Sequence, residues 1–104
     1  MEQKEKTLRE AIAEIRQELM RLGEMRPGNL SRQTAGNKSA QYWQVSYTHK
    51  MKSRTEYVRA DQVSRIQKEI QTYQRFKKLV QQWVDAALEL SQRMSKNAKI
   101  KPSE

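Results

Sequence analysis

Basic and aromatic side chains gather in one stretch of this sequence, YWQVSYTHKMKSRTEYVR at residues 42–59. Cations neutralise the phosphates of a nucleic acid, and aromatic rings stack on exposed bases. The candidates are four cations and four aromatic residues: Lys50, Lys52, Arg54, Arg59, Tyr42, Trp43, Tyr47 and Tyr57. Phosphate contacts of this kind give affinity without sequence preference. The stretch therefore predicts a nucleic-acid-binding surface, which Arg32 and Lys38 in the preceding segment extend.

A second basic cluster comprises Arg75, Lys77 and Lys78. On a helix, these side chains could follow a phosphate backbone. They could equally form a solvated charged face, and the sequence leaves both interpretations open.

The sequence gives little support for metal binding or catalysis. Glu10, Glu14 and Glu18 share a helix face, but arginines lie near them and no histidine completes a metal site. His49 is the sole histidine, the chain has no cysteine, and Gly-rich phosphate loops, HExxH and GxSxG are absent. We therefore expect no catalytic residues, no metal site and no cofactor.

The formal net charge of +9 is unevenly distributed. Residues 1–24 carry five basic and six acidic side chains, whereas residues 25–59 carry seven basic side chains and one acid, Glu56. Residues 60–104 carry nine basic and five acidic side chains. A field of this sign attracts polyanions, and we expect DNA rather than RNA. A merely solubilising surface, or one for an acidic protein or a membrane surface, is the competing interpretation.

The N-terminus, MEQKEKTLRE, lacks the apolar core of a signal sequence. No window holds the roughly 18–20 apolar residues of a membrane span. The sequence therefore predicts a soluble cytoplasmic protein with no membrane partner, associated with the nucleoid if it binds DNA.

Apolar residues repeat at heptad spacing over residues 3–22 and predict a helix there. They are Leu8, Ile12, Ile15, Leu19 and Leu22. Gly23 suits the position just after the helix, and RPGN at 26–29 prevents its continuation. Residues 29–41 are polar, lack periodicity and predict an irregular loop.

Residues 42–48 and 53–59 alternate like the two strands of an antiparallel hairpin. Their connection, HKMKS, has no Gly, Asn or Asp, which favours a loose loop over a tight primed turn. An isolated hairpin is marginal in water, so its apolar face must pack on the helices. We expect Trp43 and Val45 to be core residues and the cations to lie on the opposite, outer face.

A second apolar repeat predicts a helix over residues 61–95, with Asp61 as its N-cap. Its members are Val63, Ile66, Ile70, Tyr73, Phe76, Val80, Trp83, Ala87, Leu90 and Met94. The C-terminal half of this helix has more apolar residues than a two-helix seam needs, which predicts a homodimer or a partner protein. The expected interface residues are Leu8, Ile12, Ile15, Leu19, Val80, Trp83, Val84 and Leu88.

These elements predict an α+β, mainly α protein. A long antiparallel, coiled-coil-like helical pair is joined by a two-stranded antiparallel β-hairpin. Residues 1–96 form a single domain, and residues 97–104 form a disordered basic tail.

Three segments resemble those of a family of small, uncharacterised bacterial and archaeal proteins: RPGNLSRQ (26–33), YWQVSYTHKMKSRTEYV (42–58) and YQRFKKLVQQWVDAALELS (73–91). The resemblance implies a layout of helix, hairpin and long helix, and a setting near mobile elements, with transposases or recombinases as neighbours. Many members have a cysteine-rich stretch where this chain has QTAGNKSAQ, so any cysteine-based organisation of that loop is lost here. The family's glycine at the hairpin turn is Met51 in this chain, which agrees with a loose loop.

We therefore expect a non-catalytic nucleic-acid-binding accessory protein of transposition or recombination. The alternative is a helical adaptor that binds a recombinase, a transposase or another partner through its coiled-coil seam, with the charge incidental.

Overall fold

The structure is a computed structural model that describes residues 2–34 and 41–98, and these residues form two compact units. The helical unit combines the N-terminal helix with residues 76–98 of the C-terminal helix. The sheet unit, residues 23–75, holds an antiparallel sheet and the first part of the C-terminal helix. The predicted class, α+β and mainly α, is confirmed.

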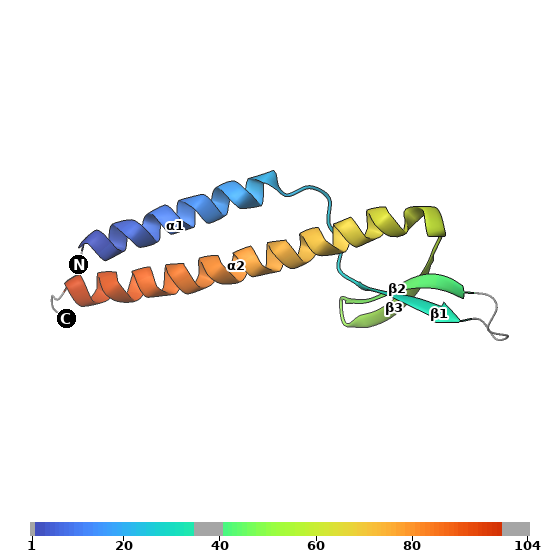
Figure 1. Cartoon of the computed structure of the whole chain (residues 1–104). Helices are drawn as coiled ribbons and strands as arrows, with labels where there is room; N and C mark the ends of the chain where they lie inside the picture. Colours follow the sequence, from blue (N-terminus) through green and yellow to red (C-terminus); the bar gives the residue numbers. More distant parts are fainter. Residues whose placement is uncertain (1, 35–40, 99–104) are drawn as a thin grey trace. The chain divides into compact units, whose positions relative to one another are not determined.

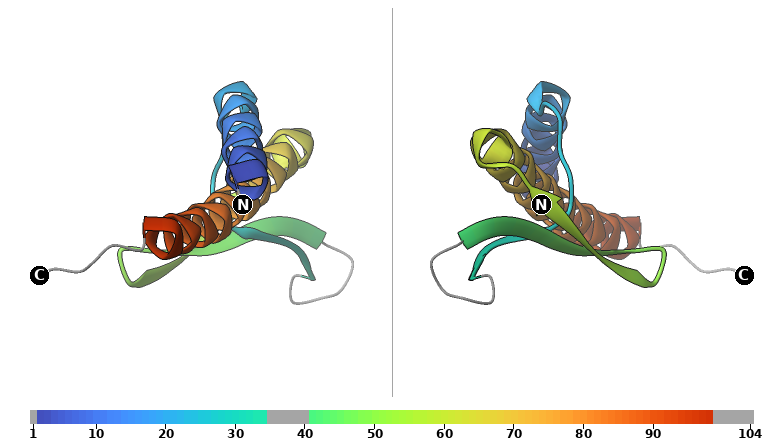
Figure 2. Two further views of the ribbon diagram at one scale, coloured as in Figure 1. Left: turned by 90° about the vertical axis from the view of Figure 1, so that its left-hand side faces the viewer. Right: turned by 90° about the vertical axis from the view of Figure 1, so that its right-hand side faces the viewer.

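The sheet has three strands rather than the predicted two (Figures 1 and 2). They are β1 (Asn29–Thr34), β2 (Gln41–His49) and β3 (Lys52–Val58), antiparallel in the order β1-β2-β3. The prediction of an irregular loop over residues 29–41 is therefore wrong for β1 and for Gln41, which belongs to β2, and residues 35–40 lie outside the described residues. Leu30 is the one large apolar residue of β1, so the strand has no visible period-2 pattern.

A small hydrophobic core joins one face of the sheet to the first turns of α2 (Val63–Ala98). Its buried side chains are Val45, Val58, Ile66 and Ile70. Leu30, Trp43 and Val63 are partly buried and pack against them. The predicted core role of Trp43 and Val45 is confirmed, and the face that packs on α2 is hereafter the helix-side face.

The turn between β2 and β3 is tight, because His49 pairs directly with Lys52. Lys50 and Met51 form a two-residue loop with φ angles of 53° and 66°. Positive φ at both positions is the signature of a type I′ turn, so the predicted loose loop is wrong. Cross-strand pairs along the whole hairpin fix this register and override the local preference for Gly or Asn.

Replacing Met51 by glycine should raise the free energy of unfolding by about 0.4–1 kcal/mol. Glycine adopts positive φ without the steric penalty of a side chain. The side chain of Met51 is 96% exposed, so the substitution removes almost no packing. Thermal unfolding would measure the change, with Lys52→Gly as the control. Lys52 is the first residue of β3 and pairs with His49, and glycine at this strand position is expected to lower the melting temperature.

The 3-10 turn η1 (Ala60–Gln62) leads from β3 into α2. Asp61 lies inside this turn, and its carboxylate accepts two hydrogen bonds from Arg59, at 3.2 Å from Nε and 2.7 Å from Nη2. The prediction that Asp61 is the N-cap of the long helix is therefore wrong, because α2 begins at Val63 and Arg59 binds the carboxylate.

In the helical unit, α1 (Glu2–Arg21) lies antiparallel to residues 76–98 of α2 (Figure 1). Three contacts set this direction: Asn97 with Glu5, Arg9 with the sulfur of Met94 at 3.4 Å, and the Arg16 guanidinium over the Trp83 ring at 5.9 Å. Leu8 and Ile15 of α1 and Leu79 of α2 are buried. Leu79 thus takes the buried position that the sequence assigned to Val80, which is 36% exposed.

Both helix ends differ slightly from the prediction. α1 ends with Leu22 N–H donating to the Leu19 carbonyl at 3.2 Å. Gly23 does not have positive φ and is not a left-handed cap, contrary to prediction. α2 continues to Ala98, so Asn97 is helical rather than part of a tail, and residues 99–104 lie outside the described residues.

Candidate nucleic-acid interface

The charged side chains of the described strands all lie on one face of the sheet. Directly paired residues of an antiparallel sheet share a face, so the register assigns each position. The helix-side face carries the core residues together with Arg32, Lys52, Arg54 and Glu56, because these pair with Trp43, His49, Tyr47 and Val45. The outer face has three residues from β1, four from β2 and three from β3: Asn29, Ser31, Gln33, Tyr42, Gln44, Ser46, Thr48, Ser53, Thr55 and Tyr57. The prediction that the cations lie opposite the core is therefore wrong.

The cations can share a face with the core because their side chains are long. Arginine and lysine lay their methylene stems along apolar surface while the charged group stays in water. Arg32 follows this pattern, with its guanidinium 5.5 Å from the centre of the Trp43 ring. Arg54, Lys52 and the turn residue Lys50 are exposed. The hairpin and its turn thus present an exposed basic edge, here defined as Lys50, Lys52 and Arg54. Arg32 is also exposed but lies on β1, the opposite edge strand of the sheet.

Glu56, the sole acid of the described strands, is held by two neighbours. The Tyr47 hydroxyl donates to its carboxylate at 2.6 Å, and Arg26 Nη2 lies 3.3 Å from the other oxygen. The Arg26 guanidinium also lies over the Tyr47 ring at 5.0 Å. Sequence reasoning missed this group, because Arg26 precedes β1 and nothing in the spacing links it to Tyr47 or Glu56.

The hydrogen bond from Tyr47 lowers the pKa of Glu56 below its usual value of 4.5, and the positive charge of Arg26 lowers it further. The same hydrogen bond raises the pKa of Tyr47 above 10.0. Ionised Glu56 is therefore favoured in the folded chain, as is the un-ionised hydroxyl of Tyr47. The hydrogen bond therefore stabilises the fold fully at pH values between the usual pKa of a glutamate and the usual pKa of a tyrosine.

Replacing Glu56 by glutamine should reduce the loss of stability that acid causes. Because the folded pKa lies below the unfolded one, this contribution is full above pH 4.5 and is lost as the pH falls through the folded pKa. The variant should be less stable than wild type at neutral pH, and the difference should vanish in acid. Melting curves across an acid series would measure this, with the exposed Glu24→Gln as the control. A difference that persists in acid would assign the effect of Glu56 to packing instead.

A shallow hollow between β3 and the start of α2 is lined by Arg26, Arg59 and Arg65. Each binds one carboxylate: Arg26 with Glu56 at 3.3 Å, Arg59 with Asp61 at 2.7 Å, and Arg65 with Glu69 at 2.8 Å. The hydrogen bond from Arg59 lowers the pKa of Asp61, and the same bond raises that of Arg59. The charges of these three arginines are balanced, and the basic edge contributes part of the positive charge that the sheet unit has beyond them.

The second basic cluster is divided between the two units. Arg75 belongs to the sheet unit, whereas Lys77 and Lys78 belong to the helical unit, and all three are exposed on α2. Lys38, another predicted phosphate ligand, lies outside the described residues.

The predicted interface residues fall into three groups by exposure. Leu8 and Ile15 are buried, while Ile12, Leu19 and Trp83 are half-buried in the helical unit. Val80, Val84 and Leu88 are 36%, 52% and 57% exposed. These three follow one another at four-residue spacing and form an exposed apolar stripe along α2.

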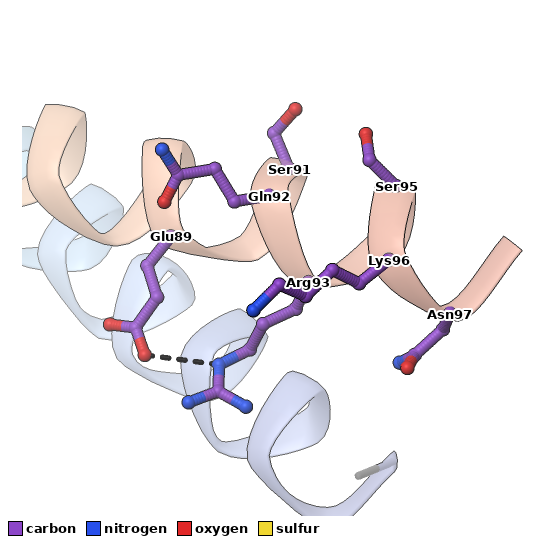
Figure 3. A pocket seen from close by; sticks show the side chains of 7 residues that line it. All are labelled: Glu89, Ser91, Gln92, Arg93, Ser95, Lys96 and Asn97. Atoms are coloured by element: carbon purple, nitrogen blue, oxygen red, sulfur yellow. Dashed lines mark hydrogen bonds and ion pairs between the residues drawn. The ribbon is translucent and has the colours of Figure 1, made fainter. Parts of the chain in front are cut away.

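A larger hollow lies on the C-terminal part of α2 (Figure 3). Seven residues line it: Glu89, Ser91, Gln92, Arg93, Ser95, Lys96 and Asn97. Glu89 and Arg93 form an i,i+4 ion pair at 3.0 Å, as on many exposed helix faces. The residues that line this hollow include no histidine or cysteine.

Neither a metal cluster nor a membrane-spanning helix occurs in the part of the chain that the structure describes. No group of three metal-ligating side chains comes together there. None of its helices has the length and apolarity that crossing a bilayer requires.

These features define a small, mainly helical protein whose three-stranded meander packs on a long helix and carries a basic edge. A family model described as a domain of unknown function, DUF6788, matches residues 2–68. The chain therefore belongs to this family, and the prediction of an uncharacterised family is confirmed. The match covers α1, the sheet and the first turns of α2 but not residues 73–91. No curated protein and no solved structure matches the chain.

Proposed function

We propose that this protein is a non-catalytic nucleic-acid-binding protein that holds phosphates with its basic edge. The observation that carries the proposal is the charge of the sheet unit. Residues 23–75 have ten basic and four acidic side chains, and this net +6 is two-thirds of the +9 of the whole chain. Arg26, Arg59 and Arg65 are neutralised by their carboxylate partners, and the exposed cations of the basic edge contribute to the positive field that remains.

Binding at this edge would be electrostatic and independent of sequence. The exposed cations can each neutralise a phosphate and release its counterions. Such contacts fix the position of a nucleic acid but do not read its bases. The mobile-element setting implied by the family resemblance fits an accessory role, in which this protein holds DNA for a transposase or recombinase.

Removing two lysines from the basic edge should weaken binding and its salt dependence. For the double variant Lys50→Ala/Lys52→Ala, the slope of log affinity against log salt should fall by about 0.9 per lost phosphate contact on duplex DNA. Fluorescence anisotropy across a salt series would measure this. The matched control is Lys4→Ala/Lys6→Ala on α1, which removes the same charge from exposed positions elsewhere. Equal slopes for the two double variants would exclude the basic edge, and no binding at low salt would exclude the function.

A second candidate function rests on the apolar stripe of α2. Exposed Val84 and Leu88, with Val80 beside them, offer a helix-sized surface to a partner helix or to a second copy of this chain. In this case the protein is an adaptor and its charge is incidental. Leu88→Asp should then abolish dimerisation or pull-down of the partner, whereas Gln82→Asp, at an exposed polar position, should not. Sedimentation velocity of both variants would separate the two functions.

A further inference from the structure

The outer face of the sheet is polar but carries no charge. All ten residues that the described strands place there are Ser, Thr, Asn, Gln or Tyr. Some of them bond to one another, as Ser46 does to Thr55 and Gln33 does to Ser31, at 3.4 and 3.0 Å. In a chain with 32% charged residues, a whole sheet face without charge is a distinct surface.

Two tyrosines form the apolar part of this face. The rings of Tyr42 and Tyr57 lie 6.3 Å apart between centres, at an interplanar angle of 39°. Tyr42 is 36% exposed and Tyr57 is 68% exposed, so neither ring is committed to the core. Gln33 pairs with Tyr42 across the sheet, and Gln44 pairs with Tyr57. Each ring therefore has an amide neighbour that can donate and accept hydrogen bonds.

An arginine lies near one of the two rings, that of Tyr57. Arg59 follows Tyr57 by two residues, and its backbone is still extended, with φ −66° and ψ 147°. Together with Tyr57, Arg59 lines the hollow between β3 and the start of α2. Its side chain is 67% exposed, and Asp61 binds it through Nε and Nη2. The Asp61 carboxylate therefore neutralises the guanidinium, so the border of this face carries no excess charge at Arg59.

We infer that the outer face is a stacking platform for unpaired nucleobases, so that the protein binds single-stranded nucleic acid in preference to duplex. This inference rests on the proposed function and names the form of its ligand. Unpaired bases expose both a ring face, which stacks on tyrosine, and a hydrogen-bonding edge, which an amide can meet. Tyr42 and Tyr57 would receive the bases, and Gln33 and Gln44 would contact their edges.

A duplex fits this face less well. The bases of a duplex are stacked and paired, so a protein surface meets the phosphates first. The ten residues of the outer face offer no cation to those phosphates. A protein partner also fits less well, because the two tyrosine rings are the sole large apolar groups among these ten residues. A single strand, with its exposed base faces and edges, matches the two rings and the amides of this uncharged face.

The experiment compares labelled oligothymidylate, oligouridylate and a mixed-sequence duplex of equal length by fluorescence anisotropy at low salt. Wild type should bind both single strands more tightly than the duplex. Tyr42→Ala and Tyr57→Ala should each weaken single-strand binding about tenfold, within the range for loss of one base–aromatic stack. Duplex binding should change less than twofold. Tyr57→Phe keeps the ring and should bind like wild type, whereas Lys50→Ala/Lys52→Ala should weaken single strand and duplex alike.

Each other outcome overturns the inference in a distinguishable way. If both alanine variants bind single strands like wild type, the outer face is not the platform, while the proposed function stands on the binding that remains. If Tyr57→Phe loses as much affinity for single strands as Tyr57→Ala does, the hydroxyl rather than the ring is responsible for binding, and stacking is excluded. A dimer that the alanine variants dissociate, with unchanged single-strand binding, would make the face a contact between copies of the chain. If wild type binds none of the three probes, the proposed function fails together with the inference.

Discussion

Replacing Leu79 by alanine should destabilise the helical unit by about 2–5 kcal/mol, the usual cost of truncating a buried leucine. Leu79 is 1% exposed and is the most deeply buried of the three buried side chains in this unit, ahead of Leu8 and Ile15. With so few buried residues, the surrounding helices have little other core to hold them together. Urea unfolding followed by circular dichroism would show a lower midpoint with an unchanged slope.

The neighbouring residue provides the matched control. Val80 is 36% exposed, so Val80→Ala should change the free energy of unfolding by no more than about 0.5 kcal/mol. Alanine also has the higher helix propensity, which offsets part of the lost contact. If Val80→Ala lowers the free energy of unfolding as much as Leu79→Ala does, α2 packs a different face against α1.

The same pair of residues shows where sequence patterning stops being informative. From Phe76 to Trp83, the spacings 3 and 4 through Leu79 fit a helical stripe as well as 4 and 3 through Val80. Spacing alone cannot choose between adjacent apolar residues, and only packing against α1 decides. On α1 no such rival exists beside Leu8 or Ile15, and both are buried as predicted.

In the sheet, the sequence predicts the two strands that have a clear alternating pattern, β2 and β3, and it does not predict β1. β2 and β3 are predictable because aromatic and β-branched residues alternate in them. β1 has one large apolar residue and is held by its pairing with β2. The sequence does not predict the tight turn, because strand pairing rather than local residue preference determines the backbone conformation of Lys50 and Met51. The alternation within β3 already places Arg54 on the face of Val58, so the correct face of the cations follows once Val58 is known to be core.

This division of the sheet separates two kinds of binding that the sequence presents as one cluster. The basic edge, on the side of α2, can supply affinity for phosphates of any nucleic acid. The tyrosines of the outer face can supply a preference for unpaired bases. Substitutions on one face should therefore leave the contribution of the other intact, since Lys50 and Tyr57 share no contact in the hairpin register.

Replacing Gly28 by alanine should destabilise the sheet unit by about 3 kcal/mol, because two penalties act together. The φ angle of Gly28 is 152°, a backbone conformation that residues with a side chain rarely adopt. A Cβ atom at this position would lie 2.6 Å from Cγ2 of Val45. Val45 is fully buried against Ile66 and Ile70, so it cannot move aside without disturbing the core. Thermal and urea unfolding would both measure the loss.

Gly23→Ala is the control for this substitution, because no atom lies within 4 Å of a Cβ added there and its φ is not positive. It should be neutral or stabilising by up to about 1 kcal/mol through the lower entropy of the unfolded chain. The double variant Gly28→Ala/Val45→Ala separates the two penalties. Removing Cγ2 of Val45 relieves the clash but not the backbone strain, so the two substitutions together should cost less than the sum of their separate effects. Strict additivity would show that the close approach to Val45 contributes nothing and that backbone conformation alone requires glycine at position 28.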